Sequence, residues 1–197
     1  MVEKKLNNNI VWHNGKVSYQ DRCENLGQKG IVLWFTGLSA SGKSTIAVEL
    51  EKALLEKGKT TYRLDGDNIR HGLNSDLGFS SQDRKENIRR IAEVAALFRD
   101  AGIITLASFI TPYKESRELA RNSIGDEFFK EIYVKADIET CQKRDPKGLY
   151  KKALAGEIKD FTGVSAPYEE PIDPFLVLDT DKLTVEECVN KIFELID

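Results

Sequence analysis

The sequence predicts an α/β protein: a three-layer sandwich whose central, five-stranded parallel sheet carries helices on both faces. Two observations support this prediction. Five short, largely apolar runs recur along the chain, and segments with a helical spacing of apolar residues lie between them. Alternating strands and helices are joined by right-handed crossovers into a doubly wound sheet, and the ligands of such sheets bind beyond the carboxyl ends of the strands. We expect the functional site at that edge.

The first expected strand, GIVLWFT, is apolar on both faces, as strands of a covered parallel sheet are. The five strands are expected at residues 30–36, 60–65, 103–109, 131–136 and 175–179. Helices are expected after Ser44, where an apolar stripe runs to Gly58, and over about 88–98. The final helix follows Thr184, which together with Glu187 has the spacing of a capping box.

The chain has 197 residues, which suits one domain, and its composition is that of a globular protein, with 41% hydrophobic and 31% charged residues. Its 29 basic and 32 acidic residues give a formal net charge of −3, so no overall basic field would attract nucleic acid or an anionic membrane. No apolar run is long enough to span a bilayer, and the polar first residues lack the apolar core of a signal peptide. We expect a cytoplasmic protein without nucleic acid or membrane partners.

The three cysteines, Cys23, Cys141 and Cys188, lie far apart in the sequence. Their spacing fits neither a disulfide framework nor the short paired spacings of zinc sites, so we expect free thiols. The two histidines, His13 and His71, are isolated from the cysteines and from each other. No metal site through histidine is therefore expected.

A phosphate-binding motif lies between the first expected strand and the first expected helix. Residues 37–44, GLSASGKS, match the pattern G-x-x-x-x-G-K-[ST] in the structural context that this motif requires. Glycines allow backbone N–H groups to turn toward phosphates, and the N-terminus of the following helix adds the positive end of its dipole. The residues expected to contact the nucleotide are Gly37, Leu38, Ser39, Ala40, Ser41, Gly42, Lys43, Ser44 and Thr45.

The side chains of this loop predict a magnesium nucleoside triphosphate, such as ATP with Mg²⁺, as the ligand. Lys43 is expected to reach the β and γ phosphates, and Ser44 to place its hydroxyl on the magnesium ion that bridges them. The chain has neither an NKxD sequence for guanine recognition nor an LSGGQ sequence, and no acidic pair follows the third strand, which ends ASFITP. These features disfavour a GTPase switch or a mechanical ATPase.

Two carboxylates, Asp65 and Asp67, follow the second expected strand, beside the phosphate loop. Kinases of small molecules receive their acceptor at this place. Either carboxylate could hold magnesium through water or accept the proton of the acceptor. The alternative interpretation is a turn in which these residues act as Asx caps.

Side chains suited to an anion and a ring follow these acids. Arg70 and Phe79 precede the second expected helix, and Arg84 and Asn87 share one of its faces at positions i and i+3. Two arginines, an aromatic ring and an amide close to carboxylates favour a doubly anionic acceptor with a flat ring. Taken singly, each of these residues is more often a surface charge or a core ring.

The alternation of strands and helices breaks between about residues 144 and 171. This stretch contains several prolines, glycines and basic side chains, and no long apolar stripe crosses it. Such an insertion is typical of a mobile lid, and a solvated loop is the alternative. The expected organisation is an N-terminal arm, 1–29, followed by a P-loop kinase domain, 30–197, that carries the lid. An apolar cluster at residues 10–12 could pack as an arm or as a short strand.

Six segments closely resemble the adenylylsulfate kinases: GLSASGKST, LDGDNIRHGLNSDLGFS, DRKENIRR, SFITPY, RDPKGLYKKALAGEIKDFTGV and SAPYE. The resemblance covers about residues 10–196. It implies a P-loop nucleoside triphosphate hydrolase-like fold and transfer of the ATP γ-phosphoryl group to the 3′-hydroxyl of adenylylsulfate (APS). The products would be ADP and 3′-phosphoadenylylsulfate, in sulfate assimilation. It also implies a homodimer.

The resemblance assigns roles to residues of the matching motifs. Asp65 is similar to a magnesium-associated carboxylate and Asp67 to a residue beside the acceptor ribose, and the sequence does not separate the proton acceptor from the metal anchor. The other acceptor-site residues that it implies are Arg70 and Arg84 with Asn87 for the phosphosulfate, Phe79 and Phe161 around the adenine, Ile110 in the pocket wall and Lys147 in the lid. On the donor side, Arg144 is similar to a residue that packs on the adenine of ATP.

Two positions depart from the family pattern. Thr111 stands where many relatives have a serine assigned as a phosphorylated intermediate. We expect no phosphoenzyme, because phosphate-loop kinases position donor and acceptor for direct in-line transfer. Ala40 stands where glycine is common, and we expect it to have a negative φ. The alternatives to this function are another P-loop small-molecule kinase and a catalytically silent nucleotide-binding module.

Overall fold

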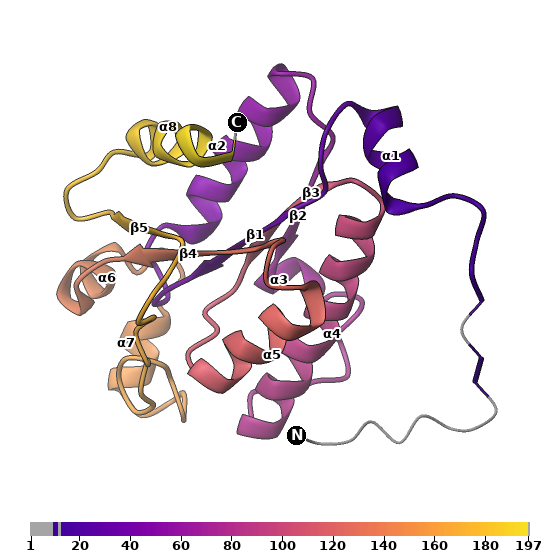
Figure 1. Cartoon of the computed structure of the whole chain (residues 1–197). Helices are drawn as coiled ribbons and strands as arrows, with labels where there is room; N and C mark the ends of the chain where they lie inside the picture. The colour runs from indigo at the N-terminus through magenta and orange to yellow at the C-terminus, as the bar shows by residue number, and fades with distance from the viewer. Residues whose placement is uncertain (1–9, 12, 197) are drawn as a thin grey trace.

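A computed structural model describes residues 10–11 and 13–196 and shows the expected parallel sheet (Figure 1). The strands are β1 (Val32–Thr36), β2 (Thr61–Asp65), β3 (Ile104–Ser108), β4 (Phe129–Lys135) and β5 (Leu176–Asp179). Their order across the sheet is β2-β3-β1-β4-β5, and every neighbouring pair runs parallel. All carboxyl ends therefore meet at one edge, with β1 at the centre.

The helices form the two outer layers. They are α1 (Tyr19–Leu26), α2 (Lys43–Glu56), α3 (Gly66–Ile69), α4 (Ser81–Asp100), α5 (Lys114–Ile124), α6 (Ile138–Arg144), α7 (Leu149–Leu154) and α8 (Val185–Ile196). α2 and α8 cover one face of the sheet, while α4 and α5 cover the other (Figure 1). The prediction of a three-layer sandwich is confirmed. The predicted capping box is also present, because the N–H of Glu187 donates to Thr184 Oγ1 at 3.2 Å and the N–H of Thr184 donates to Glu187 Oε2 at 2.8 Å.

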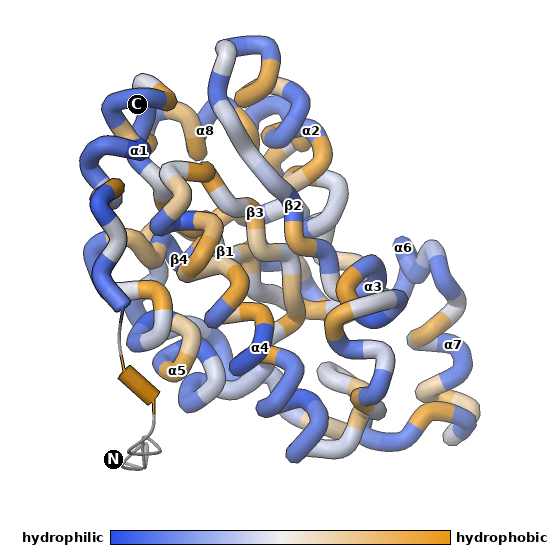
Figure 2. Tube along the Cα trace, turned by 90° about the vertical axis from the view of Figure 1, so that its right-hand side faces the viewer, coloured by the Kyte–Doolittle hydropathy of each residue, from blue (hydrophilic) through white to orange (hydrophobic). Residues whose placement is uncertain are grey.

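The sheet is apolar on both sides because side chains alternate between two cores. Leu33 and Phe35 of β1 pack with α2 and α8, whereas Val32 and Trp34 pack with α4 and α5. All four side chains are fully buried, and each burial of this kind contributes about 1.5–3 kcal/mol. Figure 2 shows apolar residues along the strands of the sheet and many polar residues along the helices outside it. This packing fixes the strand ends that position the site.

The 144–171 insertion is folded, which disfavours the interpretation as a solvated loop. It contains α7, and a small apolar cluster joins it to α6. The cluster consists of Ala136, Cys141, Tyr150, Ala153 and Phe161. The rings of Tyr150 and Phe161 meet edge to face with centroids 5.0 Å apart, and the Tyr150 hydroxyl donates to the carbonyl of Ser39 at 3.1 Å. The insertion is thus attached to the phosphate loop, and its mobility as a lid stays a prediction.

The expected N-terminal arm contains a helix, α1, that sequence reasoning missed. Ser18 and Asp21 form a capping box at its start, and this Ser-x-x-Asp signal could have revealed it. Arg22 forms an ion pair with Asp100 at the end of α4 and donates from Nε to the carbonyl of the same residue at 2.6 Å. Part of the arm therefore packs on the domain that contains the sheet.

Other expectations concern the chain as a whole. Ile10 and Val11 are exposed and lie in no strand, and Trp12 falls outside the described residues. The cysteines are free thiols, as predicted. Within residues 10–11 and 13–196, no group of His, Cys, Asp and Glu side chains could hold a metal ion by itself. In the same residues, no helix combines the length and the apolar character needed to cross a bilayer.

Candidate active site

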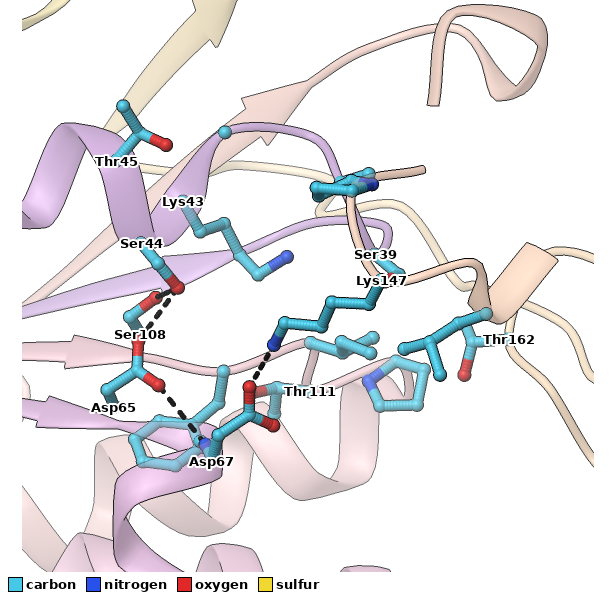
Figure 3. A pocket seen from close by; sticks show the side chains of 18 of the residues that line it. Ser39, Lys43, Ser44, Thr45, Asp65, Asp67, Ser108, Thr111, Lys147 and Thr162 are labelled. Carbon is cyan, nitrogen blue, oxygen red and sulfur yellow. Dashed lines mark hydrogen bonds and ion pairs between the residues drawn. The ribbon is translucent and has the colours of Figure 1, made fainter. Parts of the chain in front are cut away.

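A cleft of about 1190 Å³ opens at the carboxyl edge of the sheet. The phosphate loop, the ends of β2 and β3 and the insertion contribute to its walls (Figure 3), and so does the start of α4. Pockets for a single small ligand usually measure about 300–1000 Å³. The cleft is therefore larger than the usual pocket for one small ligand.

The phosphate loop connects β1 to α2 and depends on two glycines. Gly37 has φ 149, and a Cβ there would lie 2.3 Å from the carbonyl oxygen of Val134, so no other residue lets the loop pass β4 this closely. Gly42 has φ 102 and precedes the first residue of α2. The first N–H groups of a helix have no acceptor within the helix. These groups and the helix dipole make the start of α2 an anion-binding site.

The expectation for Ala40 is wrong, because its φ is 60. This left-handed conformation costs a residue with a Cβ about 1–2 kcal/mol. The tight curvature of the loop sets the backbone here whichever residue occupies the position, and the alanine methyl packs against the apolar cluster of the insertion. Glycine would take the same conformation without the steric cost.

Lys43 lies buried inside the loop. Its Nζ donates to the carbonyl oxygens of Gly37 at 2.9 Å and Leu38 at 2.6 Å. Burial lowers the pKa of Lys43 to about 8, although Cys141 and Asp65 act in the opposite direction. A buried ammonium held by neutral carbonyls gains strongly from an added anion, so Lys43 is suited to bind phosphate.

The remaining loop residues have different surroundings. Ser39, Ala40, Gly42, Ser44 and Thr45 line the cleft, whereas the side chain of Leu38 packs against the apolar cluster of the insertion. Ser41, also expected at the nucleotide, is fully buried, and its carbonyl accepts a hydrogen bond from Thr180 Oγ1 at 2.9 Å. Thr180, which follows β5, was missed by sequence reasoning; its position at the carboxyl edge of a predicted strand was the available signal.

Ser44 and Asp65 meet at the base of the cleft. Ser44 Oγ donates to Asp65 Oδ2 at 2.7 Å and lies 3.4 Å from the Oγ of Ser108, which ends β3 and was not predicted (Figure 3). Asp65 Oδ1 accepts the N–H of Asp67 at 3.1 Å, so the alternative of an Asx cap is right for this oxygen. Mg²⁺ takes one or two protein oxygens and completes its shell with water and phosphate oxygens. The residues present therefore fit a magnesium ion bound together with a triphosphate.

Asp67 occupies a different environment from Asp65. Its exposed carboxylate forms an ion pair with Lys147 of the insertion (Figure 3). Asp65, by contrast, is 8% exposed. The two acids thus face different parts of the cleft, Asp65 the phosphate loop and Asp67 the insertion.

The two expected acceptor arginines lie close together. Arg84 donates to the carbonyl of Phe79 at 2.9 Å, to the carbonyl of Asp160 at 2.7 Å and to Thr162 Oγ1 at 3.1 Å. The guanidinium of Arg70 stacks on the Phe79 ring, 4.3 Å from its centroid. Burial and then the neighbouring Arg84 lower the pKa of Arg70. Two adjacent like charges favour a bound anion between them.

The structure brings the other expected residues to the same cleft. Ile110, Phe161 and Asn87 line it, although the Phe161 ring also packs on Tyr150. Arg144 also lines it and lies beside the end of β5, where its guanidinium donates to Thr180 Oγ1 at 3.0 Å and to the Thr180 carbonyl at 2.7 Å. No expected site residue lies in another part of the molecule.

Comparison with known proteins identifies the family. The model of the adenylylsulphate kinase family matches residues 29–179. The chain is 58% identical to the adenylyl-sulfate kinase of Staphylococcus carnosus over 189 residues, which is 96% of this chain and 95% of that protein. It is 57% identical to the enzyme of the same name from Clostridium acetobutylicum over 193 residues, 98% of this chain and 96% of that protein. The chain belongs to the adenylylsulphate kinase family.

Solved structures agree with this membership of the adenylylsulphate kinases. The APS kinase CysC of Mycobacterium tuberculosis, solved in complex with AMPPNP and APS, has a TM-score of 0.82 and 48% identity, covering 85% of this chain and 98% of that one. A hexameric APS kinase from Thiobacillus denitrificans has a TM-score of 0.63 and 34% identity, covering 85% of this chain and 28% of that one. A sugar kinase from Janibacter, at 21% identity and a TM-score of 0.57, shares the fold alone.

Thr111 lies in a strained turn of this adenylylsulphate kinase, with φ 42. Its hydroxyl accepts a hydrogen bond from Trp34 Nε1 at 3.1 Å, and its carbonyl accepts one from Arg117 at 3.0 Å. Arg117 in turn pairs with Glu131 at 2.8 Å, and both side chains are buried. Sequence reasoning missed this pair, because single charges in a sequence look like surface residues. The hydroxyl of Thr111 points to the indole of Trp34, which favours a structural role.

Proposed function

We propose that the chain transfers the γ-phosphoryl group of ATP to the 3′-hydroxyl of APS. One observation carries the proposal: a single cleft holds a phosphate loop on one side and, on the other, an acceptor region with two adjacent arginines and an exposed carboxylate. Membership of the adenylylsulphate kinase family supports the identity of the acceptor. ATP and APS together would account for the size of the cleft.

On the donor side, the chain's own groups hold the triphosphate. The N–H groups at the start of α2 and the Lys43 ammonium bind its oxygens and stabilise the charge that shifts during transfer. Ser44 and Asp65 would hold Mg²⁺, which supplies further neutralisation of the phosphates when bound. Arg144 would pack on the adenine of ATP.

On the acceptor side, Asp67 would orient the 3′-hydroxyl and accept its proton, while Arg70 and Arg84 bind the phosphosulfate. Phe79 and Phe161 would enclose the adenine, with Ile110 in the wall. Because these cations are partly buried, an acceptor with fewer charges leaves them unpaired. Adenosine monophosphate is therefore expected to be a poor acceptor.

The insertion would act as a lid that excludes water, a competing acceptor. Three contacts already connect it to the acceptor region: Lys147 pairs with Asp67, and Arg84 donates to Asp160 and to Thr162. Closing over APS would exchange these contacts for contacts with the substrate. Lid closure and phosphoryl transfer are thereby coupled.

We further propose a homodimeric, cytoplasmic enzyme of sulfate assimilation, on the basis of the family resemblance. Light scattering on the purified protein tests the dimer, and a monomer at micromolar concentration would contradict it.

The deciding experiment is to mix the purified protein with Mg²⁺, ATP and APS and to identify the products by mass spectrometry. The expected products are ADP and 3′-phosphoadenylylsulfate. Lys43→Ala, which loses the ammonium proposed to bind phosphate, is the negative control, with its folding checked by circular dichroism. Product from a sugar acid or a nucleoside instead of APS would favour another small-molecule kinase. Absence of ADP with every acceptor would favour a silent nucleotide-binding module.

A further inference from the structure

Asn74 is a fully buried amide in the turn that connects α3 to α4. Its Nδ2 donates to Oδ1 of Asn87 at 2.9 Å. Its Oδ1 is buried and has no hydrogen-bond partner among the described residues. Burying an amide costs free energy unless its polar atoms are hydrogen-bonded. The unpaired Oδ1 of Asn74, beside a residue expected at the acceptor site, therefore requires an explanation.

The two amides could form this hydrogen bond in either direction, and the direction can be decided by comparing which buried polar groups each one leaves unpaired. As the amides lie, a single buried acceptor, Asn74 Oδ1, has no partner. With both amides turned over, Asn87 would donate, and the NH₂ group of Asn74 would be buried with neither hydrogen bonded. Orphaned buried N–H groups are rarer than unpaired carbonyl oxygens. Asn74 is therefore the donor and Asn87 the acceptor.

This direction decides which end of Asn87 is available to a ligand. Its Oδ1 is engaged by Asn74, whereas its Nδ2 makes no hydrogen bond to any residue that the structure describes. Asn87 lines the cleft, one turn along α4 from Arg84. An NH₂ group can only donate, so it suits an anion. An amide oxygen in its place would repel one.

We propose that Asn74 is a positioning residue that locks the amide of Asn87 with its NH₂ group toward the anionic part of the acceptor. The inference rests on the proposed function and assigns a specificity role to a residue that does not itself line the cleft.

The turn does not depend on Asn74 alone, which makes this role separable from folding. Arg90 of α4 donates to the carbonyl of Leu73 at 3.2 Å and pairs with both carboxylate oxygens of Asp76, at 2.7 and 2.9 Å. These contacts hold the turn against α4 on either side of Asn74. A change at Asn74 should therefore alter the orientation of Asn87 more than the position of the turn.

The first test is Asn74→Asp, measured at pH 7.5 with varied APS and varied ATP. The new side chain has nearly the same shape but accepts hydrogen bonds, so Asn87 turns its NH₂ group toward it and presents Oδ1 to the cleft. We expect the KM for APS to rise about tenfold or more, as for loss of a hydrogen bond to a charged group, and the KM for ATP to change less than about twofold. The matched control is Asn122→Asp, an exposed position on α5 with the same change of charge, which should alter neither constant.

The second test is a double-mutant cycle with Asn87→Ala. If Asn74 acts through Asn87, adding Asn74→Asp to Asn87→Ala raises the KM for APS by less than about twofold. The inference would be overturned if the effects of the two substitutions on the KM for APS multiplied in the double variant. It would also be overturned if Asn74→Asp raised the KM for ATP as much as the KM for APS. Should Asn74→Asp fail to fold, Asn74→Ala enters the same cycle with the same two outcomes. A wild-type protein that makes no 3′-phosphoadenylylsulfate would instead refute the proposed function, so the two failures are distinguishable.

Discussion

The proposed donor and acceptor halves of the cleft use different kinds of chemical group. In the proposed assignment, the donor half relies chiefly on main-chain groups of residues 37–44, mounted on the central strand β1 and the core helix α2, with the side chains of Lys43, Ser44 and Asp65 beside them. The acceptor half consists of side chains from the turn before α4, from α4 itself and from the insertion. Backbone N–H groups recognise what all nucleoside triphosphates share, whereas the choice of acceptor depends on particular side chains. Substitutions in the two halves should therefore have separable effects.

The largest effect is expected at Lys43, whose ammonium we propose binds the phosphates. Lys43→Ala should lower kcat about 100- to 1000-fold, because it removes a preorganised charge from the transferring group. The measurement is steady-state turnover of APS, with circular dichroism to verify folding. A folded variant with a kcat within tenfold of wild type would contradict the role of Lys43.

The acceptor half is tested by Arg84→Ala. The KM for APS should rise about 10- to 100-fold, since a charge-assisted hydrogen bond is lost, while the KM for ATP stays within about twofold. The variant should also discriminate less between APS and adenosine monophosphate. An unchanged KM for APS would show that Arg84 serves the lid contacts with Asp160 and Thr162 and does not bind the anion.

Substitution of Thr111 tests whether its hydroxyl stabilises the fold or takes part in phosphoryl transfer. Thr111→Val removes the hydroxyl and leaves the indole N–H of Trp34 without its acceptor, so the free energy of unfolding should fall by about 1–3 kcal/mol. Turnover should persist, because no phosphoenzyme is needed for in-line transfer. Denaturant unfolding and the APS assay check the two parts. Complete loss of phosphoryl transfer by the folded variant would establish a covalent role for the hydroxyl.

The smallest effect concerns the strained position of the donor half. Ala40→Gly should raise the free energy of unfolding by about 1 kcal/mol or less, because glycine takes φ 60 without steric cost and offsets part of this by its greater freedom in the unfolded chain. The matched control is Ala53→Gly in the regular helix α2. This substitution should lower the free energy of unfolding by about 1 kcal/mol. Changes of the same sign in both variants would contradict the strain at Ala40.

The insertion shows where prediction from the sequence stops. Its prolines, glycines and charges predict an irregular segment, and the structure adds an apolar cluster that joins Tyr150 and Phe161 to Ala136 and Cys141. The four residues have no regular spacing, so no periodicity could predict that they would meet. The sequence contains only a weak indication that Ser108 and Thr180 belong to the site, namely their positions at the ends of predicted strands. It is the strand order that brings the ends of β3 and β5 to the phosphate loop.

The sequence by itself determined the sheet, the order of its elements along the chain and the phosphate loop. These depend on neighbouring residues: the alternation of apolar runs, the glycines of residues 37–44 and the capping box at Thr184 act within a few residues of chain. Through its motifs it also identified the family. The tertiary structure alone decided the positive φ of Ala40, the direction of the Asn74–Asn87 hydrogen bond and the buried pair beneath Thr111. The first depends on how the loop between β1 and α2 curves in the folded chain, and the other two join groups that become close, and lose water, only when the chain has folded.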